Sequence, residues 1–230
     1  MTLLEAIEQR HSIRAYQKRP LEADVVAALQ AVIDECNAAS GLRIQLITDD
    51  PKGFGTSLLA HYGKFRNADH YIAIVGDKRL PGLDELTGYY GERIVLEAQR
   101  MGLNTCWVAL TYRTNRDRVD IRDDEKLTCV ISIGYGVNPE GAPHRIKRID
   151  QVAKSLLPGG EMPDWFVAGV NAALLAPTAI NQQKFRFTLQ ADGRTVVAEE
   201  SAWGPYSTID LGIVKLHFEI GSGVKLMHNS

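Results

Sequence analysis

Apolar and polar residues alternate along this chain with spacings that switch between helical and strand-like. Apolar residues at three- and four-residue steps predict helices over residues 2–9, 21–39, 88–103, 164–175 and about 206–220. Alternating or short, continuously apolar runs predict strands over residues 43–50, 70–78, 104–112 and 126–136, and a strand pair over residues 184–200. Because helices and strands alternate, the pattern predicts an α/β or α+β fold built on one central sheet.

A cluster of helix-breaking residues, Pro158, Gly159, Gly160 and Pro163, interrupts this pattern. We therefore predict two parts, residues 1–157 and 158–230, packed as one globular unit. The order helix, alanine-containing loop and strand in residues 25–50 recurs in residues 165–193. A decayed internal duplication and a chance similarity both explain this repeat.

The composition of the chain argues against several classes of protein. The net charge of −2 over 230 residues argues against a nucleic-acid binder, which normally has a basic excess. The start of the chain does not resemble a signal peptide, and the longest apolar runs are too short to span a bilayer. Cys36, Cys106 and Cys129 fit neither a disulfide framework nor a zinc site, and the histidines lack metal-ligand spacing. We expect a cytoplasmic protein that holds no metal.

The segment "RHSIR" places Arg10, His11, Ser12 and Arg14 within five residues. Guanidinium groups form planar forks that suit a phosphate or a carboxylate, and the serine adds a hydroxyl donor. An anion-binding segment is one interpretation of this spacing. A solvated helix end is the other.

A second polar segment, "APTAINQQKF", spans residues 176–185 at the entrance of a predicted strand. Its amides at Asn181, Gln182 and Gln183 each offer a donor and an acceptor, which suits the edge of a heterocycle. A capped turn, in which Thr178 and Asn181 satisfy local backbone groups, is the alternative.

Together the two segments resemble the motifs of the nitroreductase family of FMN oxidoreductases. The first motif, Arg-[Arg/His]-Ser-x-[Arg/Lys]-x-[Phe/Tyr], is matched by Arg10, His11, Ser12, Arg14 and Tyr16. The second, Ala-Pro-Ser-x-x-Asn-x-Gln-Pro-[Trp/Phe], is matched by Ala176, Pro177, Thr178, Asn181, Gln183 and Phe185, with Lys184 in place of the proline. The stretch 102–107, the Ile-Gly-Tyr at 133–135 and the basic cluster after it also resemble the family.

This resemblance implies an α+β, nitroreductase-like fold with a mixed, mainly antiparallel sheet and a possible internal pseudo-twofold. In the family, one subunit of a dimer supplies the first motif around each FMN and the other subunit supplies the second. Here the well-formed second motif lies in the tail, and "NAASGLRIQ" occupies its usual place. We therefore predict a subunit fused to a truncated second half, with one FMN site. A monomer and a homodimer are both compatible with it.

The resemblance also implies roles for individual residues. Arg10, His11 and Ser12 would hold the FMN phosphate and ribityl end or the pyrimidine edge, and Arg14 would lie near flavin N1 and O2. The segment passing the central ring would comprise Trp107, Val108, Ala109 and Leu110, with a backbone N–H of one of the last two reaching N5. Further phosphate charge would come from Arg145, Lys147 or Arg148, and the tail would contribute Pro177, Thr178, Asn181 and Gln183.

The implied activity is that of an oxidoreductase in which NADH or NADPH reduces FMN. FMN then passes electrons to a small acceptor, such as a nitroaromatic or quinone, in a ping-pong cycle. No catalytic side chain is needed, because the cofactor carries the hydride chemistry, and Cys106 fits a core position better than a nucleophile. Tyr89, Tyr90 and Trp203 line a substrate entrance or simply pack. The alternatives are a non-enzymatic FMN-binding storage or sensor protein, and a degenerate fold with an empty site.

Overall fold

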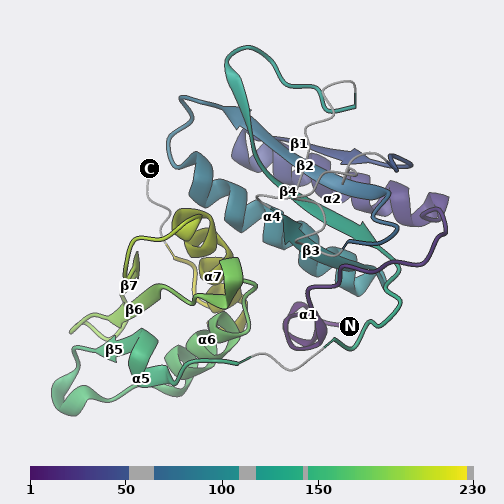
Figure 1. The fold of residues 1–230 in the computed structure, drawn as a ribbon. Coiled ribbons are helices and arrows are strands. Elements are labelled where there is room, and N and C mark those ends of the chain that lie inside the picture. Colours follow the sequence, from purple (N-terminus) through teal and green to yellow (C-terminus); the bar gives the residue numbers. More distant parts are fainter. Residues whose placement is uncertain (52–64, 109–117, 142–144, 227–230) are drawn as a thin grey trace. The chain divides into compact units, whose positions relative to one another are not determined.

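The computed structural model describes residues 1–51, 65–108, 118–141 and 145–226. The chain forms two units, each described by itself. The sheet unit comprises Gln9–Leu83 and Arg93–Ala142, and the tail unit comprises Met1–Glu8, Asp84–Glu92 and Pro143–Ser230. The predicted α+β class with mainly antiparallel strands is confirmed (Figure 1). A division at residues 157 and 158 stays a prediction.

The described residues contain a helix or strand for each element that the sequence predicts. In chain order the elements are α1 Leu3–Gln9, α2 Ala23–Ser40, β1 Arg43–Ile47, β2 His70–Asp77, α4 Leu83–Arg100, β3 Asn104–Val108, β4 Glu125–Gly134, α5 Ile149–Val152, β5 Ala153–Ser155, α6 Asp164–Leu174, β6 Phe185–Leu189, β7 Val196–Glu200 and α7 Ser207–Ser222. The short α5 and β5 are not predicted by the pattern. Within the described part of the chain, no helix combines the length and apolar character needed to cross a membrane.

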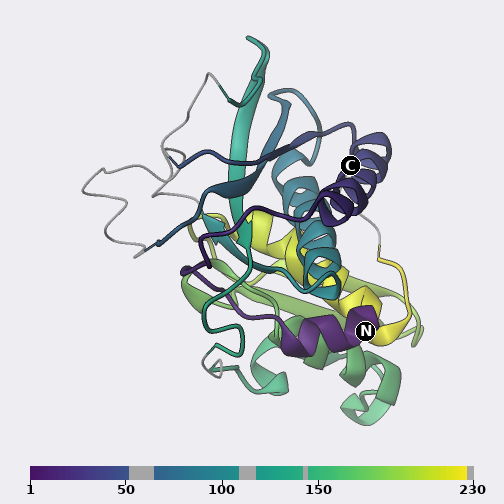
Figure 2. The same ribbon diagram turned by 90° about the vertical axis from the view of Figure 1, so that its right-hand side faces the viewer.

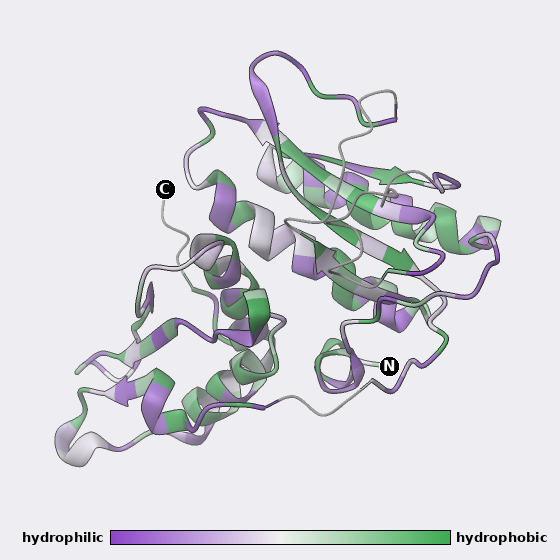
Figure 3. Ribbon diagram, in the orientation of Figure 1, coloured by the Kyte–Doolittle hydropathy of each residue, from purple (hydrophilic) through white to green (hydrophobic). Residues whose placement is uncertain are grey.

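The sheet unit is built on a four-stranded antiparallel sheet in the order β1-β2-β4-β3. Its central strand β2 is almost entirely buried, and the middle of the sheet is largely hydrophobic in Figure 3. A core cluster including Tyr16 and Tyr71 packs within this unit. Helix α2 buries Leu29 and Ile33 and ends at Gly41, whose φ of 73° is left-handed and favours glycine. The apolar stripe and the stop predicted for this helix are therefore both present.

The tail unit contains a three-stranded sheet in the order β5-β6-β7, with β5 parallel and β7 antiparallel to β6. Helices α6 and α7 pack against each other, and Figure 2 shows α7 in yellow alongside the green strands β6 and β7. Three phenylalanines link these elements. The rings of Phe187 and Phe218 stack with centroids 4.5 Å apart, and Phe166 meets Phe218 edge-on at 5.7 Å. The tail thus has an apolar core of its own.

Two glycines allow the first half of α4 to cross α7 within the tail unit. A Cβ on Gly88 would lie 1.9 Å from the carbonyl oxygen of Ile209, and a Cβ on Gly212 would lie 2.0 Å from that of Glu85. No side chain fits at such distances, so glycine is required at both positions. The pattern predicts a helix beginning at residue 88, and this is wrong because α4 begins at Leu83. The glycine marks a helix crossing and not a helix start.

Among the elements that the structure describes, the order helix, strand, strand, helix occurs twice, as α2-β1-β2-α4 and as α6-β6-β7-α7. In both regions the two strands pair antiparallel. This shared order is what an internal duplication would leave. The duplication itself stays a prediction.

Candidate cofactor site

The predicted site residues fall into two sets that belong to different units. Residues 10–14 and 107–108 lie in the sheet unit, whereas residues 145–148 and 177–183 lie in the tail unit. Ala109 and Leu110, expected to offer a backbone N–H to the flavin, lie outside the described residues.

Backbone hydrogen bonds fix the N-terminal segment within the sheet unit. Ser12 forms a parallel bridge with Thr105 of β3, and the N–H of Ile13 donates to the Thr105 carbonyl at 3.0 Å. Farther along, Tyr16 forms an antiparallel bridge with Gly136. The segment therefore runs beside the strand that carries the predicted Trp107, which is half-buried.

A buried tyrosine anchors this segment to the sheet. Tyr16 is 1% exposed, and its hydroxyl donates to the Ile13 carbonyl at 2.6 Å. Because a carbonyl only accepts, the Ser132 hydroxyl 2.7 Å away donates to the tyrosine oxygen. Burial raises the pKa of Tyr16 far above its usual value, so the hydroxyl keeps its proton. Tyr16 thus braces the turn that contains Arg14.

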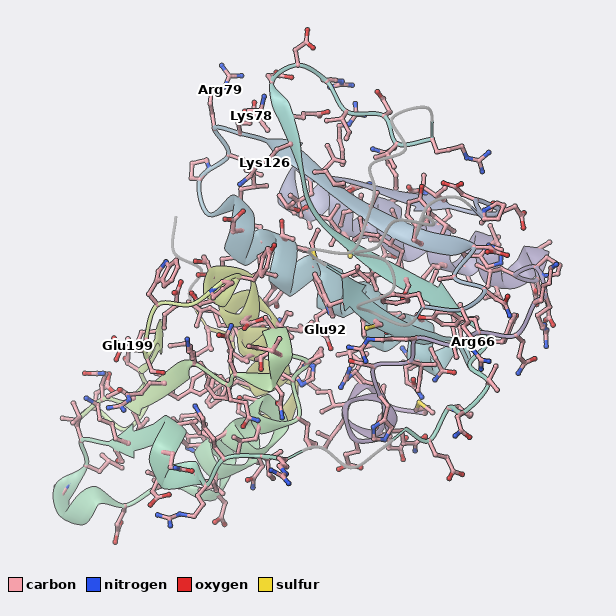
Figure 4. All side chains as sticks on the ribbon, in the orientation of Figure 1. Arg66, Lys78, Arg79, Glu92, Lys126 and Glu199 are labelled. Carbon is pink, nitrogen blue, oxygen red and sulfur yellow. The ribbon has the colours of Figure 1, made fainter. Side chains whose placement is uncertain are left out.

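Backbone hydrogen bonds join the segment around Arg14 to Arg66, a contact that the sequence does not reveal. The N–H of Arg66 donates to the Arg14 carbonyl at 2.9 Å, and the N–H of Tyr16 donates to the Arg66 carbonyl at 3.0 Å. Both arginines are exposed, and Arg66 is labelled in Figure 4. Among the described residues, no carboxylate forms an ion pair with either guanidinium. The bridge pairs Arg66 with Ala15, so the side chains of Arg14 and Arg66 point to opposite sides of this pairing.

Arg10 and His11 are more enclosed than Arg14. Arg10 is 3% exposed, and Gly141 approaches His11 so closely that a Cβ there would lie 2.6 Å from its ring. Burial, and then the charge of Arg10, lower the pKa of His11, which favours a neutral imidazole near pH 7. Cys106 is 2% exposed and burial raises its pKa. This buried thiol fits the predicted core position.

The loop of residues 176–183 is strained in the tail unit. Ile180, Asn181 and Gln183 have φ values of 46°, 54° and 46°, in the left-handed region that favours glycine. Asparagine tolerates this region, but an isoleucine there costs about 1–2 kcal/mol. Ile180 is also 95% exposed. Backbone strain of this kind is typical of functional loops.

Gln183 ties this loop to the basic segment 145–148. Its amide donates to the Arg145 carbonyl at 2.9 Å and to the Asn181 side chain at 2.7 Å, and its amide oxygen accepts the N–H of Lys147 at 2.8 Å. Asn181 also donates to the Arg145 carbonyl, at 2.7 Å. The N–H of Gln183 donates to the Thr178 hydroxyl at 3.1 Å, as a capped turn requires. The structure thus brings the two predicted segments of the tail unit together.

A buried carboxylate supports the loop from α7. Asp210 accepts the N–H of Ala179 at 2.8 Å and the side-chain amide of Gln182 at 2.7 Å. Burial raises the pKa of Asp210 to about 6, although both hydrogen bonds lower it. No motif points to this residue, because α7 follows the loop by more than twenty positions in the sequence.

The three predicted basic residues differ in their partners. Arg148 forms an ion pair with Asp150, and its Nε donates to that carboxylate at 3.0 Å. Arg145 and Lys147 form no ion pair with a carboxylate within the described part of the chain. Arg145 and Lys147 are therefore better candidates for an anion than Arg148.

Comparisons with known proteins agree with this fold. A family model described as "Putative TM nitroreductase" matches residues 2–222. No curated protein matches. Among solved structures, the chain is similar to "a putative nitroreductase" from Thermotoga maritima MSB8, at 22% identity and a TM-score of 0.68, over 96% of this chain and 83% of that one.

Two further solved structures are similar over a smaller part of the chain. One is a mutant of NfnB, an FMN and NADPH-dependent nitroreductase from Sphigopyxis sp. strain HMH, at 17% identity and a TM-score of 0.52, over 66% of this chain and 97% of that one. The other is a nitroreductase family protein from Clostridium difficile 630, at 20% identity and a TM-score of 0.50, also over 66% and 97%. At these identities the similarities show the fold.

Proposed function

Because the chain belongs to this nitroreductase family, we propose that it is an FMN-dependent oxidoreductase that takes hydride from NADH or NADPH. The acceptor we propose is a small nitroaromatic or quinone, reduced in a ping-pong cycle. When bound, FMN supplies the hydride chemistry, and the residues of the chain bind and orient it. The similar NfnB, which is FMN and NADPH-dependent, supports this choice of cofactor and donor.

The exposed guanidinium of Arg14, on a segment that backbone hydrogen bonds hold beside β3, is the observation that carries this proposal. FMN has a phosphate and a pyrimidine edge that gains negative charge on reduction, so it needs cations that are not already neutralised. Within the described chain no carboxylate forms an ion pair with the Arg14 guanidinium, so its charge is available to a bound anion. The residues present therefore fit the cofactor.

The remaining residues of the N-terminal segment and of β3 position the cofactor and take no part in the chemistry. Tyr16 fixes the turn, and Ser12 offers a hydroxyl beside β3. Cys106, buried and with a raised pKa, is not a nucleophile. This set suits a protein in which a bound cofactor carries the reaction.

A visible absorption spectrum after mixing with FMN and desalting tests the proposal. We expect retained yellow colour that bleaches when NADH or NADPH is added without oxygen. Arg14→Gln should weaken FMN binding about tenfold, since it removes a charge-assisted contact. Arg79→Gln is the control, because Arg79 is exposed and already paired with Asp77. Unchanged FMN affinity in Arg14→Gln would contradict the proposed role of this residue.

The same experiment decides between this function and the alternative of a storage or sensor protein. A yellow protein that neither nicotinamide bleaches would be a binding protein without reductase activity. We further propose one FMN per chain, because no second Arg-x-Ser-x-Arg segment occurs in the sequence. The ratio of flavin to protein absorbance, measured together with the molar mass in solution, tests this stoichiometry.

A further inference from the structure

Two apolar side chains of the tail unit are almost fully exposed. Ile180 in the loop of residues 176–183 is 95% exposed, and Trp203, which follows β7, is 86% exposed. No other large apolar side chain that the structure describes is more than 54% exposed. Apolar surface left in water forgoes the stabilisation that burial normally gives such residues. These two residues therefore differ from the rest of the described apolar side chains in the tail unit.

Hydrogen bonds hold the loops of the two residues together. The side-chain amide of Gln182 donates to the Pro205 carbonyl at 3.0 Å, and the Lys184 ammonium donates to the Trp203 carbonyl at 3.1 Å. A Cβ on Gly204 would lie 2.7 Å from the Gln182 amide oxygen, so the loops are in direct contact. Each exposed side chain thus belongs to a residue at most two positions from a bond that joins the loops.

A third exposed apolar residue, Ile146, adjoins the same loop. It is 54% exposed, and the carbonyl of the preceding Arg145 accepts the side-chain amide of Asn181 at 2.7 Å. Asn181 follows Ile180 directly, so this bond joins the immediate neighbours of the two isoleucines. We refer to Ile146, Ile180 and Trp203 as the apolar rim. The rim takes one residue from each of three segments that hydrogen bonds tie together.

The backbone conformation of Ile180 indicates that its exposure has a purpose. Its φ of 46° lies in the left-handed region, where a β-branched residue is strained. Such strain persists only where other contacts impose it, and here Asp210 accepts the N–H of Ala179 and Thr178 accepts the N–H of Gln183. Because the side chain gains almost no packing in the free protein, a bound ligand would provide the contact that offsets the strain.

We propose that the apolar rim binds the electron acceptor, and that this acceptor is a quinone with an extended apolar ring system. This inference rests on the proposed function and narrows its substrate class. Three separate apolar contacts suit a ligand larger than one ring, and the Trp203 indole offers a face for stacking. Lys184 adds a polar complement, because its half-buried ammonium uses one of three donors on the Trp203 carbonyl and keeps the others for a quinone oxygen.

Two pairs of variants test the rim. Ile180→Asn and Trp203→Ser remove apolar surface, whereas Ile180→Leu and Trp203→Phe retain it. Asparagine tolerates the left-handed backbone at position 180, so this change does not endanger the fold. Leu156→Asn is the matched control, since Leu156 is an apolar residue of the tail unit that is 48% exposed and lies outside the three segments of the rim.

The measurement compares the KM values of benzoquinone and of menadione, which has a larger, fused ring system, in the FMN-loaded enzyme. In Ile180→Asn and Trp203→Ser the ratio of the menadione KM to the benzoquinone KM should rise about tenfold, because apolar contact area is lost. We expect the wild-type ratio in Ile180→Leu, Trp203→Phe and Leu156→Asn. A merely structural role would change both KM values by the same factor. An unchanged ratio in both surface-removing variants overturns the proposal.

Failure of the proposed function is recognised separately. If the wild-type protein reduces neither quinone, calorimetry measures the binding of menadione without a nicotinamide. A Kd that rises about tenfold in Trp203→Ser and not in Leu156→Asn supports the rim, whereas equal Kd values or no binding overturn it. A wild-type dimer that Trp203→Ser converts to a monomer, with the KM ratio unchanged, would mean that the rim contacts a second copy of the chain, and this too would overturn the proposal.

Discussion

The two helix–strand–strand–helix regions differ most in the segment that joins the first helix to the first strand. After α2 the chain turns at Gly41 and enters β1 almost at once. After α6 it runs through residues 175–184, where Ile180, Asn181 and Gln183 all have positive φ. The same order of elements therefore carries a simple turn in one region and a strained polar loop in the other. The candidate chemistry of the second region lies in this connection and not in its helices and strands.

The largest effect is expected where α4 of the first region meets α7 of the second. Gly88→Ala and Gly212→Ala would each place a Cβ 1.9 or 2.0 Å from a carbonyl oxygen of the other helix. We expect each variant to lose more than about 3 kcal/mol of unfolding free energy or to fail to fold. Urea unfolding followed by circular dichroism measures this.

Gly41→Ala is the control for both glycine variants. Gly41 has open space around it and only the cost of a left-handed φ, about 1–2 kcal/mol. If the Gly88 and Gly212 variants lose no more than this control, the two helices do not cross as closely as the structure shows.

The second largest effect concerns a buried pair that joins the same two helices. His217 is fully buried, its Nδ1 donates to the Ala172 carbonyl at 3.0 Å, and its Nε2 lies 2.8 Å from the Glu92 carboxylate (Glu92 is labelled in Figure 4). His217→Ala removes this buried contact and leaves a cavity in place of the imidazole, which should cost about 3–5 kcal/mol. Chemical unfolding gives the value, with Arg79→Ala as an exposed ion-pair control expected to lose under about 1 kcal/mol. Similar losses in both variants would argue against a buried pair.

A smaller effect, a pH-dependent change in unfolding free energy, is expected for the strained loop at residues 175–184 and not for the turn at Gly41. Asp210 anchors the loop and its pKa is raised to about 6, against a value near 4 in an unfolded chain. The native protein therefore binds more protons between pH 4 and 6, so this stabilising contribution is present below pH 4 and is lost as the pH rises through 6. About two pKa units correspond to roughly 3 kcal/mol at most.

Asp210→Asn removes this titration and keeps a side chain of the same shape. The difference in unfolding free energy between wild type and variant should fall by about 2–3 kcal/mol from pH 4 to pH 7.5. Taking the difference removes the contribution of all other titrating groups. A difference that stays constant across this range would show that Asp210 titrates normally.

The smallest effect is expected at Ile180, the exposed residue of the strained loop. Ile180→Asn keeps the left-handed backbone but places there a residue that tolerates it, and it removes little buried surface because Ile180 is 95% exposed. We expect a gain of about 0.5–1 kcal/mol in stability, measured as a rise in the unfolding midpoint. A loss would mean that the isoleucine side chain contributes packing to the native protein.

The sequence predicts the elements well because their signals are local. The stripe of α2 and its stop at Gly41 are read from neighbouring residues, and so is the antiparallel strand pair around Asp192 and Gly193. Gly88 shows where such signals mislead, because a glycine is needed for a contact with a helix more than one hundred residues away. The pattern alone cannot distinguish that requirement from a helix boundary.

The candidate site is predictable only as far as its motifs extend. Arg14 and Gln183 stand out within short motifs, but their neighbours are assembled by long-range contacts. Arg66 reaches Arg14 through backbone hydrogen bonds between separate segments, and Asp210 reaches the loop from α7. The hydrogen bonds of Gln183 go to the chain itself, and a flavin contact through its amide stays a prediction.

The crossing of α4 and α7 affects which substitutions the two helices can carry independently of each other. Gly88 and Gly212 are separated by the same number of residues as Glu85 and Ile209. Exchanging the two helices therefore turns the contact of Gly88 with Ile209 into the contact of Gly212 with Glu85, as a twofold axis would. In a symmetric dimer every substitution at such an axis appears twice. Here both helices belong to one chain, and Lys215 pairs with Glu85 at 2.5 Å while the mirrored positions hold Gly91 and Ile209. A charged pair on one side of the axis and small or apolar residues on the other form an asymmetry that two identical subunits could not have at a twofold axis.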